Sequence, residues 1–504
     1  MTMNSPDSSL NAARRARELL EVRERVVDVL VVGLGATGAG VALDAASRGL
    51  SVAAIDAYDL AFGTSRWSSK LIHGGLRYLA KGQVGIARES AAERGILLRH
   101  TAPHLVQAHP YLLPLTGDVS RVQARLAMTG YRLGDALRVT AGTPRRLLPG
   151  PARIPAGRAL DLVPALDPKN LRGALLSWDG RVADDARLVL AIARTAAAHG
   201  ARVLTRCRAL ALSGDDGQVR DELTGQEFTI RAKAVVNATG VWAGGLVPGV
   251  ELRPSRGTHL VLRPGTLGTL RAGLHIPIPG AGNRFALVLP QLDGRVYVGL
   301  TDEPLDGPVP DVPEAPESDV KFLLEVLGSV LAEPLRRDQV ASAYAGLRPL
   351  LAAAGGGTAD LSRRHAVLHS PDGVVTVVGG KLTTYRRMAE DAVDATGLPA
   401  PRSRTARLPL VGATQRGDGA PLRLVRRYGS EATAVQDLMA REPELARPVV
   451  EGLATTRAEL VWAVRHEGAL DPDDLLDRRT RIGLIPEDRA AALPIAAAVF
   501  ASED

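Results

Sequence analysis

The sequence predicts an α/β protein (α+β overall), in which a doubly wound parallel sheet is interrupted by an antiparallel layer and followed by helices. A β-branched run at 26–32 leads through a glycine-rich turn into a helix pattern, the start of a strand–helix–strand unit. Strand patterns at 257–263, 284–290 and 295–300 follow one another without helices between them. Residues 421–482 are helical in pattern.

Residues 1–25 precede the predicted sheet and include a basic, weakly amphipathic helix pattern at 10–25. They lack the uninterrupted apolar segment and small-residue cleavage site of a secretory signal. We expect a solvated leading helix, with docking on a membrane surface as the alternative interpretation of its basic face.

The parallel sheet is predicted from apolar runs that alternate with helix patterns. The run at 26–32 is followed by a helix pattern that ends at Gly49 and by a strand at 50–55. In the antiparallel layer, Gln-Leu-Asp-Gly between the last two strands predicts a hairpin. Later elements are a helix at 184–199, strands at 202–212, 234–236 and 374–378, and a helix that ends at Asp394.

These elements predict a nucleotide-binding domain interleaved with a substrate domain within residues 26–405, followed by a helical domain at 406–504. A Pro- and Arg-rich linker at 397–411 marks the boundary. The predicted intervals are about 26–115, 170–250 and 340–400 for the nucleotide-binding domain, and about 116–169 and 251–339 for the substrate domain.

The composition restricts the class of protein. Of 504 residues, 45% are hydrophobic and 23% charged, which excludes disorder as the main feature. The single cysteine, Cys207, excludes a disulfide framework and a thiolate metal cluster, and indicates a reducing compartment. A mild net charge of +7 with 3% aromatic residues argues against nucleic-acid binding, and we predict no metal site. No apolar run reaches the ~18 residues that cross a bilayer.

A glycine fingerprint follows the first strand. Gly33, Gly35 and Gly38 have the spacing that makes a tight turn, admits a pyrophosphate and packs helix on strand. The helix that begins near Ala36 and Thr37 supplies N–H groups and a positive dipole end. Asp56, at the end of the second strand, can accept a hydrogen bond from an unphosphorylated ribose. The fingerprint predicts dinucleotide binding and leaves NAD and FAD open.

Two later segments favour a flavin. The strand at 374–378 ends in Gly379-Gly380-Lys381, and the strand at 234–236 ends in Asn-Ala-Thr-Gly at 237–240. Flavoproteins return to the cofactor with backbone groups late in the chain in this way. The alternative is that each segment is another buried strand and turn.

The polar segment 64–79 follows the fingerprint. Its hydroxyls, lysine and paired glycines suit a loop around phosphates or an isoalloxazine ring, and His73 and Arg77 could face an anion. A polar surface loop is the alternative interpretation.

With these motifs, the sequence resembles the FAD-dependent, quinone-linked (aerobic type) glycerol-3-phosphate dehydrogenases. The resemblance rests on SSKLIHGGLRYL at 68–79 and on DDARLVL, VNATG, GTH, TD, GLRPL and GGKLTTYR after it, and it covers about 26–395. The segment AELVWAVRHEGALDPDDLLDRRTRIGL resembles the helical domain of that family.

The resemblance implies a Rossmann-like FAD-binding domain with noncovalent FAD, and sn-glycerol 3-phosphate as substrate. The implied substrate-binding residues are Arg77, Tyr78, Thr301, Asp302, Arg363 and Lys381. Arg364 stands where the family often has an acidic residue, so the choice between Arg363 and Arg364 as phosphate ligand stays open. The implied FAD-binding residues are Gly33, Gly35, Ala36, Thr37, Gly38, Asp56, Thr64, Ser65, Ser68, Ser69, Lys70, His73, Gly74, Gly75, Ala238, Gly240, Gly379, Gly380 and Lys381.

The family pattern places His259 and His73 near the reacting carbon and Arg348 near the flavin, as catalytic residues. Oxidation of a secondary alcohol needs a hydride acceptor and a base for the hydroxyl proton. We assign the base to His259, because imidazole titrates near neutral pH whereas a guanidinium keeps its proton; a strand histidine satisfied by its neighbours is the alternative. Arg348 would stabilise developing negative charge. Thr301 and Asp302 either orient such side chains or end the strand.

The predicted reaction is oxidation of sn-glycerol 3-phosphate to dihydroxyacetone phosphate, with electrons passed to a membrane quinone. The alternatives are a glycerophosphate oxidase that reduces O2 to H2O2, and a flavin-containing binding protein without turnover. Since no spanning segment is predicted, we expect a cytoplasmic protein docked peripherally on the membrane. The oligomeric state stays open, with a homodimer as one option.

Overall fold

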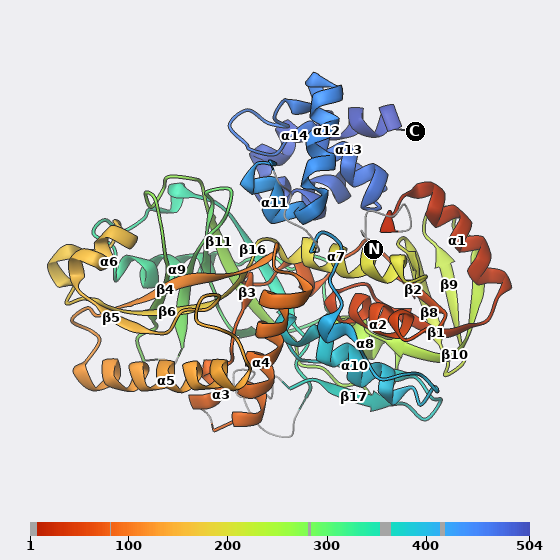
Figure 1. Cartoon of the computed structure of the whole chain (residues 1–504), viewed down its shortest axis with the longest axis horizontal. Coiled ribbons are helices and arrows are strands. Elements are labelled where there is room, and N and C mark those ends of the chain that lie inside the picture. Colours follow the sequence, from red (N-terminus) through yellow and green to blue (C-terminus); the bar gives the residue numbers. More distant parts are fainter. Residues whose placement is uncertain (1–7, 81, 281–283, 353–363, 414–418, 504) are drawn as a thin grey trace.

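The computed structural model describes residues 8–80, 82–280, 284–352, 364–413 and 419–503; of Arg77 and Ala80 it describes the backbone alone. Two large sheets lie side by side, and the C-terminal helices gather above them (Figure 1). None of the helices within these ranges is long and apolar enough to cross a bilayer.

The first sheet is the predicted parallel layer. Its order is β17–β18–β10–β1–β2–β7, and β9 pairs antiparallel with both β10 and β8. The central strand β1 is parallel to β10 and β2 and is buried along nearly its whole length, as a β-branched run between two covering layers should be. The strands are β1 Val27–Val32, β2 Val52–Ile55, β7 Arg202–Leu204, β8 Cys207–Leu212, β9 Asp216–Asp221, β10 Glu227–Asn237, β17 Ala366–His369 and β18 Val375–Val378.

Three helices cover one face of this sheet: α2 (Ala36–Ser47), α7 (Asp185–Ala198) and α10 (Tyr385–Ala395). Small and β-branched side chains of α2 and α7 form the largest hydrophobic core with β1 and β2. Helix α7 starts where predicted, because the carboxylate of Asp184 accepts hydrogen bonds from the backbone N–H groups of residues 186 and 187.

The leading helix α1 (Ala12–Glu24) packs on the sheet instead of standing free in solvent. Leu19 and Val22 belong to a core shared with β1, β8 and β10. The guanidinium of Arg15 pairs with Asp221 at 2.5 Å, and both side chains are buried. The expectation of a solvated helix is therefore corrected: the apolar face of α1 already has a partner.

The second sheet is the predicted antiparallel layer. Its order is β15–β11–β14–β13–β12–β4–β6–β3, with β16 beside β11 and β5 beside β6; of these pairs, β12–β4 is parallel. The predicted hairpin is β13 and β14. The strands are β3 Leu71–Ile72, β4 Val106–Pro114, β5 Ala152–Ile154, β6 Ala174–Val182, β11 Ser255–Leu262, β12 Gly273–Pro277, β13 Phe285–Pro290, β14 Val296–Gly299, β15 Glu303–Pro304 and β16 Val340–Arg348.

Five helices surround the second sheet and its border with the first. Helix α5 begins at a capping box, in which Ser120 and Gln123 satisfy each other's backbone N–H groups. It runs along the lower edge of the molecule beside α3 (Figure 1). The helices are α3 Leu76–Ala80, α4 Val84–Ile96, α5 Arg121–Thr140, α6 Ala156–Leu162 and α9 Glu317–Gly328.

Sheet membership differs from the predicted domain intervals in three places. Strands β3, β4, β6 and β16 belong to the second sheet, although the three intervals 26–115, 170–250 and 340–400 that contain them were assigned to the nucleotide-binding domain. The predicted strand at 202–212 is two strands, β7 and β8, separated by Arg206 with φ 55°. Each difference arises because the hydrogen-bonding partner of a strand lies far away in the chain.

The C-terminal helices pack around a core of their own and extend past residue 482, where the predicted helical pattern ended. Buried ion pairs join them to the first sheet. Asp59, after β2, pairs with Arg478 at 2.5 Å and with Arg479 at 2.6 Å. Although burial by itself would raise the pKa of Asp59, the two guanidinium groups hold it well below its usual range. The helices are α11 Leu422–Tyr428, α12 Ala432–Arg441, α13 Arg457–His466 and α14 Pro486–Glu503.

Replacing Asp59 with Asn should loosen the attachment of the C-terminal helices, because Arg479 stays buried without its carboxylate partner and Arg478 loses one of its own, keeping Asp474. Breaking one partner of a buried pair costs about 3–5 kcal/mol. The control Asp338→Asn removes one partner of an exposed pair with Arg336, worth less than about 1 kcal/mol. Thermal unfolding followed by circular dichroism should give a clearly lower Tm for Asp59→Asn, and equal Tm values for the two variants would contradict the role of Asp59.

Candidate functional site

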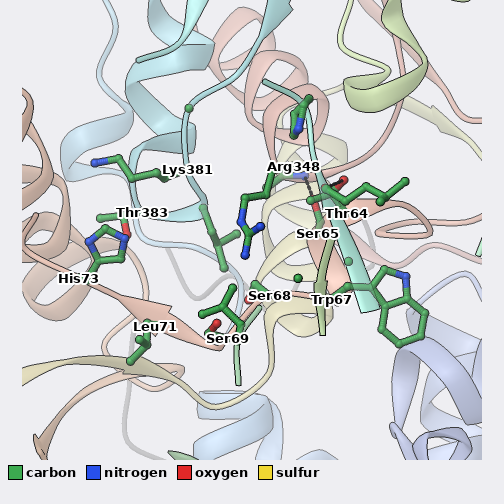
Figure 2. A pocket seen from close by; sticks show the side chains of 18 of the residues that line it. Thr64, Ser65, Trp67, Ser68, Ser69, Leu71, His73, Arg348, Lys381 and Thr383 are labelled. Atoms are coloured by element: carbon green, nitrogen blue, oxygen red, sulfur yellow. Dashed lines mark hydrogen bonds between the residues drawn. The ribbon is translucent and has the colours of Figure 1, made fainter. Parts of the chain in front are cut away.

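A cavity of about 960 Å³ lies where the carboxyl ends of the parallel strands meet the second sheet. Binding sites of open α/β sheets occupy this edge. Figure 2 shows Arg348 at the centre of the cavity, with His73 and Lys381 on one side and Trp67 on the other. The predicted site residues that line it are Gly33, Gly35, Ala36, Thr37, Asp56, Thr64, Ser65, Ser68, Ser69, His73, Tyr78, Ala238, Gly240, His259, Arg348, Gly379, Gly380 and Lys381.

The glycine fingerprint forms the turn between β1 and α2. Gly33 has φ +98°, and a Cβ there would lie 2.7 Å from the carbonyl oxygen of Ala238. Gly35 is the N-cap of α2 and faces the cavity, whereas Gly38 packs inside, where a Cβ would meet the Gly33 carbonyl at 1.7 Å. The amino end of α2 therefore opens onto the cavity, as binding of a pyrophosphate requires.

Asp56 reaches the cavity from the end of β2. Its carboxylate accepts hydrogen bonds from the N–H groups of Leu34 at 2.7 Å and Tyr58 at 2.9 Å. Burial raises the pKa of Asp56 to about 6. Each carboxylate oxygen still has a free lone pair, so Asp56 can accept a ribose hydroxyl as predicted.

The two late segments return to the same cavity. Ala238 and Gly240 follow β10, and Gly379 and Gly380 follow β18. Gly379 and Gly380 have φ of 80° and 71°, and a Cβ on Gly380 would meet the sulfur of Met388 at 2.4 Å. Because both segments line one cavity although they lie far apart in the chain, the structure favours the cofactor interpretation over two unrelated buried turns.

The serines of the 64–70 loop face the cavity. The Oγ of Ser65 accepts the N–H of Ala36 at 2.9 Å, so its own proton remains to be donated to an anion. Thr64 donates instead to the carbonyl of Leu347 at 2.7 Å. Ser68 donates from its N–H and its hydroxyl to Asp185. The loop thus presents donors to the cavity while two of its side chains fasten it to the protein.

Lys70 does not lie at the cavity. Its side chain is buried, and Nζ donates to Asp185 at 2.9 Å and to the carbonyls of Arg66 and Ser68 at 3.0 Å. Burial lowers the pKa of Lys70 to about 8, against the opposing effect of Asp185. The prediction that Lys70 binds the flavin is therefore corrected: its ammonium group fixes the loop from behind.

His259 lies on β11 with its ring in the cavity wall. Its Nε2 is 2.8 Å from the Oγ of Ser69, and Tyr344 stacks on the ring at 4.9 Å. Nδ1 has no hydrogen-bond partner among the described residues. Burial lowers the pKa of His259 well below its usual value, and the charges of Lys70 and Arg348 act in the same direction. The imidazole is therefore neutral at neutral pH, the form that accepts a proton.

Arg348 is held by three acceptors at the end of β16. Its guanidinium donates to Asp302 and to the hydroxyl of Ser255, both at 3.0 Å, and to the carbonyl of Thr301 at 3.2 Å. The hydroxyl of Thr301 bonds elsewhere, to Asp319 at 3.0 Å. Of the two predicted roles for Thr301 and Asp302, the structure therefore favours orientation of Arg348 by Asp302, from behind the cavity wall.

His73, Tyr78 and Lys381 form the opposite side of the cavity. The rings of His73 and Tyr78 lie 6.4 Å apart, and the ammonium group of Lys381 lies 4.2 Å above the Tyr78 ring while donating to Ser90. Gly74 does not line the cavity. It packs against Arg94, since a Cβ at Gly74 would lie 2.3 Å from the guanidinium of Arg94.

The loop after His73 is tied to β6. The N–H of Gly74 donates to the carboxylate of Asp179 at 3.2 Å, and Arg94 pairs with the same carboxylate at 2.6 Å. Gly75, with φ +81°, packs against Ser90 instead of facing the cavity. Gly74 and Gly75 were predicted to bind the flavin; the structure places them in the support of the loop.

Sequence reasoning missed several lining residues. Tyr111, Tyr131, Asp179 and His275 line the cavity from the second sheet and α5. They belong to none of the motifs, and only the pairing of distant strands brings them together. Two predicted groups, Arg363 and the side chain of Arg77, lie outside the described part of the chain.

Comparison with known proteins identifies the family of both parts of the chain. Residues 28–386 match the family model described as FAD dependent oxidoreductase, and residues 403–503 match the C-terminal domain of alpha-glycerophosphate oxidase. The glycine turn, the open end of α2 and Asp56 all fit a bound dinucleotide. FAD is therefore the cofactor, as predicted.

Similar proteins cover almost the whole chain. "Glycerol-3-phosphate dehydrogenase 1" of Mycobacterium tuberculosis (strain H37Rv) is 51% identical over 97% of this chain and 98% of its own. "Glycerol-3-phosphate dehydrogenase 2" of the same strain is 36% identical over 95% and 85%. The glycerol-3-phosphate dehydrogenase of Bacillus halodurans complexed with FAD has a TM-score of 0.75, with 27% identity over 97% and 94%. The chain therefore belongs to the family of FAD-dependent glycerol-3-phosphate dehydrogenases.

Proposed function

We propose that this protein oxidises sn-glycerol 3-phosphate to dihydroxyacetone phosphate and passes the electrons to a membrane quinone. The observation that carries the proposal is the meeting, in one cavity beside the dinucleotide-binding end of α2, of a neutral histidine, an arginine and a lysine. His259, Arg348 and Lys381 match what an alcohol with a phosphate group needs: a proton acceptor, a charge for the developing oxyanion and a cation for the phosphate.

Bound FAD supplies the hydride acceptor. His259 accepts the hydroxyl proton, because its neutral ring has a lone pair available. Burial and the charges of Lys70 and Arg348 keep the ring unprotonated before the substrate binds. Ser69 Oγ, 2.8 Å from Nε2, sets the orientation of the ring. Arg348, held by Asp302, keeps its charge aimed into the cavity and stabilises the substrate oxygen as its proton leaves.

Lys381 binds the phosphate group, with Tyr78 and His73 beside it. The ammonium group lies over the Tyr78 ring, which fixes its position. A compact point charge suits the several orientations of a tetrahedral phosphate. The substrate is thus oriented with its phosphate group on the Lys381 side of the cavity and its reacting carbon toward His259.

The quinone acceptor and a cytoplasmic location at the membrane surface complete the proposal. Reduction of O2 to H2O2 is the competing outcome for the acceptor. With either acceptor, the flavin is first reduced by glycerol 3-phosphate. One experiment can therefore test reduction by the substrate first and reoxidation by the acceptor afterwards.

Adding sn-glycerol 3-phosphate to the anaerobic holoenzyme should bleach the flavin absorbance at about 450 nm. A quinone analogue should then restore the yellow colour rapidly, whereas air, which forms H2O2 as it reoxidises the flavin, should restore it much more slowly. Persistent colour after substrate addition would refute the reaction, and reoxidation by air as fast as by the quinone analogue would replace the quinone by O2 as acceptor. Glycerol serves as the control, because it has no phosphate for Lys381.

His259→Gln should slow flavin bleaching by about 10²- to 10⁴-fold, the usual contribution of a positioned base. Stopped-flow absorbance at saturating substrate measures this rate, and FAD content should stay at that of the wild type. His369→Gln is the matched control, because His369 lies exposed at the end of β17. Equal bleaching rates in the two variants would remove His259 from the reaction.

Lys381→Ala should raise the concentration of glycerol 3-phosphate needed for half-maximal bleaching by at least about 30-fold, corresponding to ~2 kcal/mol for a lost cation contact. Lys381→Arg should be intermediate, because a planar guanidinium differs in reach from an ammonium group. Lys169→Ala, at an exposed position, is the control. An unchanged dependence on substrate concentration in Lys381→Ala would exclude Lys381 from phosphate binding.

A further inference from the structure

The imidazole ring of His259 offers almost no surface to a molecule in the cavity. The residue is 1% exposed. Its Nδ1 is buried and has no hydrogen-bond partner among the described residues, whereas its Nε2 lies 2.8 Å from Oγ of Ser69. Within the described ranges, the hydroxyl group of Ser69 is therefore the one polar contact of this ring.

The neighbouring strands hold the ring of His259 in close packing. On β11, His259 is paired with Gly299 of β14 on one side and with Tyr344 of β16 on the other. The Tyr344 ring stacks on the imidazole with 4.9 Å between the ring centroids. A Cβ at Gly299 would lie 2.2 Å from Cδ2 of His259 and 2.8 Å from Nε2. Because strand pairing fixes both neighbours, the ring has little room to turn toward the cavity.

Ser69 connects this buried ring to the cavity. It lines the cavity and is half-buried, and the guanidinium of Arg348 extends toward the loop that carries it (Figure 2). A hydroxyl group donates one hydrogen bond and can accept others through its lone pairs. Oγ of Ser69 can therefore accept a hydrogen bond from a substrate hydroxyl while its own proton points to Nε2 of His259.

The loop is anchored on both sides of Ser69. Ser68 donates from its N–H and its hydroxyl to Asp185, and Nζ of Lys70 donates to the same carboxylate at 2.9 Å. Lys70 has φ 56°, a left-handed conformation that costs energy for a residue with a side chain and persists where surrounding contacts impose it. Ser69 is thus fixed between two held neighbours, which keeps its Oγ within hydrogen-bond distance of Nε2.

Other polar groups near Ser69 do not offer the same connection. Thr64 donates to a backbone carbonyl, and Ser68 donates to a carboxylate that is already paired with Lys70. Arg348 keeps its proton as a guanidinium and has no lone pair to offer. Among the described hydroxyl groups of this loop, Ser69 is therefore the one that adjoins an unpaired base.

We propose that Ser69 is a catalytic residue that relays the proton of the substrate hydroxyl to His259. The substrate O–H bond breaks and its proton goes to Oγ of Ser69, while the Oγ–H bond breaks and that proton goes to Nε2. Ser69 ends as a hydroxyl group and His259 as an imidazolium, and the hydride of the same substrate carbon leaves to bound FAD. The inference deepens the proposed function and rests on it for the identity of the substrate.

The test uses the holoenzyme and two variants, Ser69→Ala and Ser69→Ala/His259→Gln, beside His259→Gln. Ser502→Ala is the matched control, because Ser502 is exposed on α14 and donates to a carbonyl of its own helix. Stopped-flow bleaching of the flavin at saturating sn-glycerol 3-phosphate, without oxygen, gives the rate of flavin reduction. The rates are measured in H2O, in D2O and in mixtures of the two.

Ser69→Ala should slow bleaching by about 10²- to 10³-fold while FAD content stays at that of the wild type. The double variant should be no slower than His259→Gln, because loss of either group already interrupts the same relay. Wild-type rates should curve downward with the fraction of D2O, as two moving protons require. Bleaching of Ser69→Ala at the rate of Ser502→Ala, losses that multiply in the double variant, or a linear dependence on D2O in wild type would each overturn the relay.

Nitrogen NMR of the holoenzyme with isotope-labelled histidines gives a measurement that does not depend on turnover. The signals of His259 are assigned by their absence in His259→Gln. The relay requires that Nε2 carry no proton in the free site and that its signal shift in Ser69→Ala, where the hydrogen bond is lost. A proton on Nε2 of the wild type would exclude the relay, because Ser69 would then accept from the ring.

The two proposals fail separately. If sn-glycerol 3-phosphate does not bleach the wild type, the proposed reaction fails, whereas the NMR spectra still decide whether Ser69 donates to Nε2 of His259. If wild type and Ser69→Ala are bleached alike, the relay fails and the reaction stands.

Discussion

The carboxylate of Asp185 is the group on which the arrangement of the site depends. At the start of α7 and fully buried, it accepts the N–H and hydroxyl of Ser68 and the ammonium group of Lys70. These contacts fix the loop that runs between the two sheets, and that loop carries Ser69 to within 2.8 Å of His259. A buried ion pair repays its desolvation only when its remaining hydrogen bonds are also made, and here they are made by the loop itself. His259, the proposed proton acceptor, is therefore positioned by an ion pair that does not line the cavity.

The same chemistry recurs wherever the C-terminal helices meet the first sheet. All but six of the 62 cationic residues are arginine, and several of them are buried in forked pairs with carboxylates. Arg194 donates twice to Glu431 at 2.7 Å, and Arg187 donates twice to Glu467. A planar guanidinium keeps its charge when buried and makes two parallel hydrogen bonds to one carboxylate, a geometry that an ammonium group does not offer. These buried arginines therefore have a structural role at the contact between the C-terminal helices and the first sheet.

The cavity has two chemically distinct sides. Lys381, Arg348 and His73 supply cationic or titratable groups where a small anionic substrate would lie, whereas the side toward α5 is lined by leucines and Phe285. The charged side matches the proposed substrate, a water-soluble phosphate ester. Because the second sheet contributes to both sides, its strand pairing decides how polar and apolar groups are separated.

The sequence by itself determined the first strand–helix–strand unit, the antiparallel hairpin and the dinucleotide-binding fingerprint whose glycines reach the cavity, because turn chemistry and side-chain period are local properties. It could not assign Lys70 to Asp185, Asp302 to Arg348, or β16 to the second sheet. Each of these depends on a partner more than 40 residues away in the chain. Tertiary structure alone decides such pairings, because the direction of a buried polar side chain is set by whichever distant group satisfies it.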